Sequence, residues 1–253
     1  TGEDIFQRDL LHEWKSEKID LSCAKKLHDR RNGLYFVQTD SNGERHFQYY
    51  RKNSAATQTL NKIPVNEIVS YASRAKVFFF SAITLAVMEH RERITAIVKQ
   101  LYGKTIIAFD TNYRAVLWRS EKEYRNAVEQ ILPYIDIILP TDTDERLLHT
   151  ALRGADIPIM YGNKNIICAM KSGRRGAFII GGWLVRATKI KPVDTTGAGD
   201  AFNAGFLTGL LWGYSPEAAA KLGNDLAGIV IRHRGAIVEK KIFLREMKKL
   251  KIV

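Results

Sequence analysis

The sequence predicts an α/β fold with a mostly parallel sheet and helices on both of its faces. Short apolar runs of strand length recur along the chain, and segments with helical periodicity separate them. Such alternation is typical of parallel strands, because their connections are long and usually helical. With 253 residues, 45% of them hydrophobic, the chain is long enough for a single domain over residues 1–253. The predicted strands of the sheet are Val77–Phe80, Thr105–Phe109, Ile135–Leu139, Asn165–Met170 and Ala177–Ile180.

The N-terminal part of the sequence predicts a helix and a hairpin instead. Ile5–Trp14 places its apolar residues on one helical face. Leu34–Gln38 and Arg45–Tyr50 have the residue pattern of strands, and Asp40-Ser41-Asn42-Gly43 between them is typical of a hairpin turn. We therefore expect two antiparallel strands at about residues 32–52, apart from the main sheet.

Start and stop signals mark the later helices. Met88–Leu101 is a helical run, and Gly103 behind it is a typical helix C-cap. Ser120 and Glu123 form a capping box for the helix that follows them. Ser215-Pro216 begins a late helix, since proline favours the first helical position.

The stretch over 194–202, Asp-Thr-Thr-Gly-Ala-Gly-Asp-Ala-Phe, is the most informative about function. An apolar run follows, so the pattern predicts a glycine-rich loop that opens a helix. Gly197, Ala198 and Gly199 let a phosphate approach the backbone, where free amides and the helix dipole form an anion hole. Asp200 beside them can accept a hydroxyl proton, and the helix N-terminus favours its ionised form. The alternative without catalysis is a glycine turn in which the aspartate only caps the helix.

Two common phosphate motifs do not explain the sequence. Gly103-Lys104-Thr105 resembles the end of a P-loop, but Val98 stands where the earlier glycine belongs, and a helix precedes the segment where a strand is needed. A dinucleotide fingerprint fails too, because Phe202 replaces its last small residue. The phosphate loop at 197–200 is therefore of another type.

Composition leaves one competing class of function. The formal net charge is +12, as in many nucleic-acid-binding proteins, but the basic residues are scattered apart from one cluster within 240–251. On a terminal helix such a cluster is usually a solvated face, so we expect no nucleic-acid partner. No apolar run reaches membrane-spanning length, and no signal-peptide pattern opens the chain. Cys23 and Cys168 lack metal-ligand spacing, which favours free thiols in a reducing cytoplasm.

Three further segments stand out beside the glycine-rich turn, namely Asn32–Phe36, Gly43–Arg51 and Phe109–Arg114 running on to Leu117-Trp118. With them, the chain resembles the ribokinase-like (PfkB) family of sugar kinases over nearly its whole length. Within the family it is most similar to the subgroup that phosphorylates 2-keto-3-deoxygluconate, a sugar acid. The resemblance implies a ribokinase-like fold, in which the strands at about 32–52 form a small lid.

The resemblance also implies a sugar site. Tyr49 and Arg51 share one face of an alternating strand, although a solvent-facing strand with Arg51 as an edge charge would look the same. Arg51 and Arg114 are expected to converge on this site. Two arginines there favour an acidic sugar as the substrate, because a guanidinium can bind a carboxylate with two hydrogen bonds. The implied sugar contacts are Tyr35, Tyr49, Arg51, Arg114 and the catalytic Asp200.

The nucleotide, the ions and the partners follow from the same resemblance. ATP carries Mg²⁺ on its phosphates, with Asp144 as a further ligand, and Asp194 with Thr196 matches positions that hold a monovalent cation such as K⁺. The family also implies a homo-oligomer, dimeric through the lid, with no membrane partner. The implied nucleotide contacts are Asn112, Arg114, Lys171, Ser172, Gly173, Gly176 and Asn224.

The chain departs from the family pattern in three places. Thr141-Asp142-Thr143-Asp144 stands where many members have Asn-x-x-Glu, which keeps a polar and an acidic group at shorter reach. Residues 153–163 match nothing well. Family members begin with several dozen further residues, so we expect the sheet to lack its first strand and the sugar pocket one wall.

We therefore expect an ATP-dependent kinase that phosphorylates 2-keto-3-deoxygluconate on its terminal hydroxyl to give the 6-phosphate. Two alternatives stay open: a kinase of a neutral sugar such as fructose, ribose or a nucleoside, and a non-catalytic nucleotide-binding remnant. ADP release across a set of sugars distinguishes the sugar-acid kinase from a neutral-sugar kinase. ATP binding without turnover on any sugar indicates the non-catalytic remnant.

Overall fold

The computed structural model describes residues 1–39, 45–152 and 154–252. The chain forms two compact units: a first unit of Thr1–Arg74 with Ile83–Leu101, and a second unit of Ala75–Ala82 with Tyr102–Val253. The hairpin turn predicted at 40–43 lies outside the described residues. Among the helices of the described part, none is both long and apolar enough to cross a membrane.

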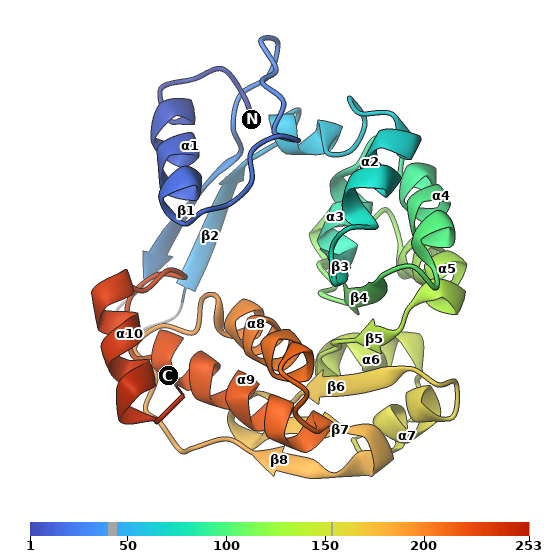
Figure 1. Ribbon diagram of the computed structural model, residues 1–253, viewed down its shortest axis with the longest axis vertical. Coiled ribbons are helices and arrows are strands. Elements are labelled where there is room, and N and C mark those ends of the chain that lie inside the picture. Colours follow the sequence, from blue (N-terminus) through green and yellow to red (C-terminus); the bar gives the residue numbers. More distant parts are fainter. Residues whose placement is uncertain (40–44, 153, 253) are drawn as a thin grey trace. The chain divides into compact units, whose positions relative to one another are not determined.

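The first unit contains a two-stranded antiparallel sheet and several helices (Figure 1). Its elements are α1 (Gln7–Ser16), β1 (Leu34–Thr39), β2 (Arg45–Tyr50), a 3₁₀ turn (Ala55–Gln58), α2 (Val65–Ala72), α3 (Ala82–Val87) and α4 (Glu92–Leu101). The predicted hairpin is confirmed, with Tyr35 opposite Tyr49 in the register. The helix predicted from Met88 begins only at Glu92, because α3 and a short turn precede it.

The second unit is built on a six-stranded sheet in the order β3-β4-β5-β6-β7-β8. Its strands are β3 (Val77–Ser81), β4 (Ile106–Asp110), β5 (Ile137–Ile138), β6 (Ile167–Lys171), β7 (Gly176–Ile179) and β8 (Leu184–Arg186). β3 to β6 pair in parallel as predicted, whereas β7 and β8 join by antiparallel pairing. The sheet is therefore mixed, and the predicted strand Ala177–Ile180 returns through a short turn instead of a helix.

The helices of the second unit begin at signals that the sequence contains. They are α5 (Glu121–Ile131), α6 (Asp142–Leu148), α7 (Asp156–Gly162), α8 (Ala198–Leu211), α9 (Pro216–Val230) and α10 (Lys240–Lys249). The Ser120 hydroxyl oxygen accepts a hydrogen bond from the Glu123 amide at 3.1 Å, and Ser215 caps α9 in the same way. α7 lies inside 153–163, where the sequence indicated no element.

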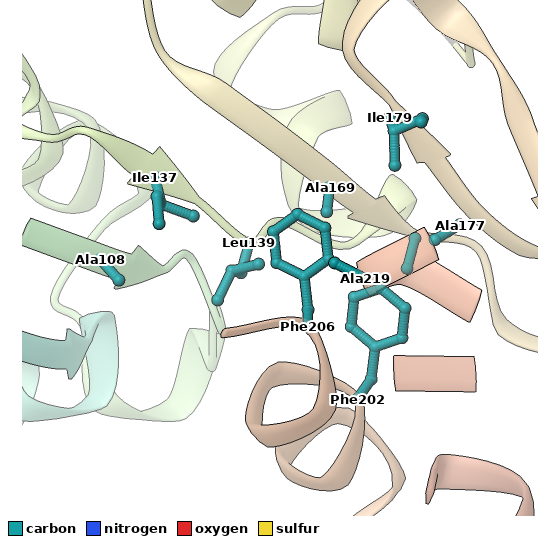
Figure 2. Packing of buried hydrophobic residues seen from close by; sticks show 10 residues of the cluster. Ala108, Ile137, Leu139, Ala169, Ala177, Ile179, Phe202, Phe206 and Ala219 are labelled. Carbon is teal, nitrogen blue, oxygen red and sulfur yellow. The ribbon is translucent and has the colours of Figure 1, made fainter. Parts of the chain in front are cut away.

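Helices cover both faces of this sheet. On one face, α8 and α9 lie side by side, and the parallel rings of Phe202 and Phe206 from α8 pack against small residues of the strands, such as Ala108 and Ala169 (Figures 1 and 2). Side chains alternate along a strand, so Cys168 next to Ala169 faces the other way. There it lies near Tyr161 of α7. The predicted α/β architecture is confirmed.

Glycines allow α8 and α9 to approach closely. A Cβ added at Gly205 of α8 would lie 2.8 Å from the Gly223 Cα atom of α9, and one at Gly209 would meet Ala219 at the same distance. Real Cβ contacts are longer, so a side chain at Gly205 must push the helices apart.

We expect Gly205→Ala to lower the free energy of unfolding by about 1–3 kcal/mol, because the extra methyl group overpacks the helix contact. Gly162→Ala in α7 is the matched control, since its Cβ would meet Ile180 at an ordinary 3.6 Å. Urea titrations of both variants measure the difference. Equal stability of the two variants would mean that α8 and α9 separate without cost.

Candidate active site

The predicted phosphate turn opens α8. Gly197 is the N-cap residue and has a left-handed backbone (φ 77°) that favours glycine. The hydrogen bonds of the helix begin with the Ala201 amide, which donates to the Gly197 carbonyl at 2.9 Å, while the Ala198 amide donates within the turn to Thr195 at 3.3 Å. A Cβ at Gly199 would meet nothing within 4 Å. There is therefore open space beside Gly199, at the start of a helix, where free amides and the helix dipole favour an anion.

Asp194 holds the loop in front of this turn. One carboxylate oxygen accepts hydrogen bonds from the Thr196 amide (2.9 Å) and hydroxyl (2.7 Å), and the other accepts from the Gly235 amide (2.9 Å). The carboxylate and the Thr196 hydroxyl group offer oxygen atoms, which are the ligands that hard cations take. In the described residues, no group of three or more His, Cys, Asp or Glu side chains could hold a metal ion. The cation site stays a prediction.

Asp200 lies in the first turn of α8 and is open to solvent on one side. Partial burial raises the pKa of its carboxyl group, and the charge of Asp110 raises it further, while the cations Lys171 and Arg114 lower it. The sequence had indicated only the favourable helix dipole. A raised pKa strengthens Asp200 as a general base, because proton transfer works best when the pKa approaches the working pH.

A buried polar cluster lies at the carboxyl end of the parallel strands. The Lys171 ammonium group, at the end of β6, donates to Asp110 Oδ2 at 2.8 Å and to Asn203 Oδ1 at 3.0 Å. The Asn203 amide group also donates to Asp110 Oδ2, at 2.6 Å. Sequence reasoning missed Asp110 and Asn203 and placed Lys171 at the nucleotide. One signal was available: two charged residues each end a buried strand, and such ends meet in a parallel sheet.

The loop after β4 carries Arg114 and is fixed from behind by Asp144. Asp144 Oδ2 accepts hydrogen bonds from the Thr111 hydroxyl (3.2 Å) and the Tyr113 amide (3.1 Å). Asn112 between them adopts a positive φ of 21°, and its amide donates to Asp110. Asp144 is only 5% exposed and anchors the loop through these two hydrogen bonds. A role of Asp144 towards magnesium stays a prediction, as do the nucleotide contacts of Asn112.

A second glycine turn, at residues 172–176, lies between β6 and β7 and carries Ser172, Gly173 and Gly176, three of the implied nucleotide contacts. The Ser172 amide donates to the Gly176 carbonyl at 2.8 Å, and Gly173 and Gly176 both have positive φ angles, 55° and 107°. A Cβ at Gly176 would lie 2.1 Å from the Val185 carbonyl oxygen of β8, so only glycine fits there. The Asn224 side chain of α9 donates to that same carbonyl oxygen at 3.0 Å. These residues are brought together, and their contacts with a nucleotide stay a prediction.

The three predicted sugar-binding residues of the first unit lie together. Tyr35 on β1 and Tyr49 on β2 have ring centroids 6.1 Å apart, and the Arg51 guanidinium lies 4.2 Å from the Tyr49 ring centroid. Both tyrosines are partly exposed. The hairpin therefore presents an aromatic surface with one cation, which suits the hydroxyl groups and carboxylate of a sugar acid.

A glycine turn that opens a helix, an adjacent carboxylate and an α/β sheet are parts that a phosphotransferase with an alcohol acceptor requires. The family model described as pfkB family carbohydrate kinase matches residues 1–241. The chain belongs to this family, and its members are carbohydrate kinases.

Two relatives and one solved structure are particularly similar. The 2-dehydro-3-deoxygluconokinase of Haemophilus influenzae is 34% identical over 252 residues, which cover 94% of this chain and 79% of the relative. The enzyme of the same name from Escherichia coli K12 is 34% identical, and the alignment covers 95% of this chain and 81% of that enzyme. A sugar kinase of Pyrococcus horikoshii in complex with ATP is 28% identical, with a TM-score of 0.72, over 93% of this chain and 76% of its own.

Proposed function

We propose that this chain transfers the γ-phosphate of ATP to the terminal hydroxyl of 2-keto-3-deoxygluconate and forms the 6-phosphate. The observation that carries the proposal is Asp200 in the first turn of α8, directly behind Gly197–Gly199. The similarity to two 2-dehydro-3-deoxygluconokinases supports the choice of sugar.

The chemistry is an in-line phosphoryl transfer. Asp200 accepts the proton of the terminal hydroxyl while that oxygen attacks the γ-phosphate and the bond to ADP breaks. Amides at the start of α8 bind the phosphoryl oxygens, whose charge is spread in the transition state. Arg114 in the loop after β4 adds a positive charge on the same side, since its charge already acts on Asp200.

The proposed ions act through the phosphates. Mg²⁺ bound to the ATP phosphates neutralises part of their charge. Asp194 and Thr196 would hold a potassium ion beside the phosphate turn. Asp194 also accepts the Gly235 amide hydrogen bond, which ties that turn to the loop after α9. We assign contacts with the ATP nucleotide to Ser172, Gly173, Gly176 and Asn224.

Sugar-acid recognition is assigned to Tyr35, Tyr49, Arg51 and Arg114. We take both units as one kinase domain whose lid is formed by β1, β2 and the adjoining residues, so that the lid supplies Tyr35, Tyr49 and Arg51. Phe36 and Tyr50 on the hairpin are about three-fifths exposed (61% and 60%), which supports a homodimer that covers them. The free thiols of Cys23 and Cys168 suit a reducing compartment, and we propose the cytoplasm.

The test is a coupled assay of ADP release with sugar acids and neutral sugars. We expect turnover with 2-keto-3-deoxygluconate and little with fructose, ribose or nucleosides. Preference for a neutral sugar would replace the substrate assignment. ATP binding without turnover on any sugar would contradict the kinase activity itself.

Loss of Arg51 or of Arg114 should weaken binding of the sugar acid more than binding of a neutral sugar. We expect Arg51→Leu and Arg114→Leu each to raise KM for 2-keto-3-deoxygluconate roughly tenfold or more, because a charge-assisted contact in a closed site is worth on the order of 1.5–3 kcal/mol. Arg8→Leu on the exposed surface of α1 is the control. Steady-state kinetics with the acid and with a neutral sugar measure the ratio, and an unchanged ratio in both variants would rule out carboxylate recognition by these residues.

A further inference from the structure

The cluster of Asp110, Lys171 and Asn203 has no part in the chemistry described so far. All three side chains are buried, with exposed fractions of 2%, 9% and 2%. Lys171 spends two of its three N–H donors on Asp110 and Asn203, so it is poorly placed to reach a nucleotide. A buried ion pair is costly to maintain, and replacing it with apolar residues is often neutral or stabilising. Its presence beside the phosphate turn therefore calls for a role other than stability.

The cluster lies under the proposed base. Asn203 follows Asp200 by three residues on α8, and residues at this spacing share one helix face. Asn203 contacts both Asp110 and Lys171, so the two buried charges lie on the side of the helix from which Asp200 projects. Charges in a poorly solvated region act strongly on each other, because little water screens them.

We propose that Lys171 is a positioning residue of the reaction: held by Asp110 and Asn203, its ammonium group keeps Asp200 in the charged form that accepts the hydroxyl proton. The inference rests on the proposed function of Asp200 as the base. Asp110 acts in the opposite direction, since its negative charge disfavours a second carboxylate nearby. The effects on the pKa of Asp200 have the directions that these roles require: partial burial and Asp110 raise this pKa, and Lys171 and Arg114 lower it. Among the described residues, Asp110 on β4, Lys171 on β6 and Arg114 in the loop after β4 are the charged groups that act on the pKa of Asp200.

The test uses opposite changes of charge. Asp110→Asn keeps the shape of the cluster and leaves Lys171 charged, so the acid limb of the kcat–pH profile should move to lower pH. Lys171→Met leaves Asp110, so the limb should move to higher pH. We expect displacements on the order of one pH unit. Asp136→Asn, before β5 and therefore at the amino end of the parallel strands, is the matched control and should keep the wild-type profile.

A second measurement does not depend on activity. In protein labelled with ¹³C-aspartate, the carboxyl signal of Asp200, assigned by its absence in Asp200→Asn, reports its protonation directly. The same opposite displacements are expected there. Circular dichroism verifies that Lys171→Met is folded, and Asp110→Asn carries the test alone if it is not.

The outcomes separate the two ideas. If the wild type phosphorylates a sugar but neither the acid limb nor the Asp200 signal moves, or both variants move in one direction, the role of Lys171 is wrong and the kinase assignment stands. If the wild type phosphorylates no sugar, the proposed function fails, and the titration of Asp200 still decides whether the cluster controls its charge.

Discussion

Replacing Asp200 by asparagine should lower kcat by roughly 10²–10⁴-fold, the usual cost of losing a general base. Asparagine has almost the same shape but cannot take up the hydroxyl proton. ATP binding should stay within a few-fold of the wild type, because the amides at the start of α8 and the second glycine turn are unchanged. Single-turnover kinetics and calorimetric titration with ATP measure the two quantities.

A matched control excludes a general effect of Asp→Asn changes. Asp9→Asn alters an exposed carboxylate on α1 and should leave kcat unchanged. An Asp200→Asn enzyme that keeps most of its kcat would remove the base from the mechanism. Loss of ATP binding in the same variant would instead mean that the aspartate mainly supports the turn, as a helix cap does.

Glu145 should make the protein less stable as the pH rises. It lies on α6 with no exposed surface. Its Oε2 accepts a hydrogen bond from the Tyr161 hydroxyl at 2.9 Å, while its Oε1 has no hydrogen-bond partner among the described residues. The pKa of Glu145 is raised from 4.5 to about 8, mainly by burial and also by the nearby Asp144, although the Tyr161 hydrogen bond opposes the change.

The sign of the effect follows from proton binding. Below pH 4.5 the carboxyl group is protonated in both the folded and the unfolded chain, and its contribution to stability is complete. Between 4.5 and about 8 the folded chain binds more protons than the unfolded one, so stability falls as the pH rises. The loss is about 1.4 kcal/mol per pH unit over this window for a single ideal group.

Glu145→Gln should therefore be more stable than the wild type at neutral pH, with a difference that grows from pH 5 to pH 8. Denaturant titrations at several pH values measure it, and Glu129→Gln on the exposed surface of α5 is the control. His149 Nε2 lies 3.8 Å from Glu145 Oε2, and burial lowers the pKa of this histidine, which favours its neutral form. If the two residues formed an ion pair, the glutamine variant would be the less stable protein at neutral pH.

The sequence alone determined the local parts of the site. Gly197 and the run behind Asp200 predict a glycine turn that opens a helix, because a left-handed backbone and free amides are properties of a few consecutive residues. The capping box at Ser120 and the hairpin of β1 and β2 were predictable for the same reason: hydrogen bonds over short distances in the chain and side-chain alternation are written in neighbouring residues.

Only the tertiary structure decided what surrounds Asp200. Asp110 lies 61 residues from Lys171 and 93 from Asn203 in the chain, and no local pattern joins them. Local periodicity also did not predict that β7 pairs antiparallel with β6, or that the three-residue strand β8 follows it. The charge state of Asp200 depends on burial and on Coulomb interactions with charges brought in by other strands. These interactions act through space, so they exist only once the sheet has brought β4, β6 and α8 together.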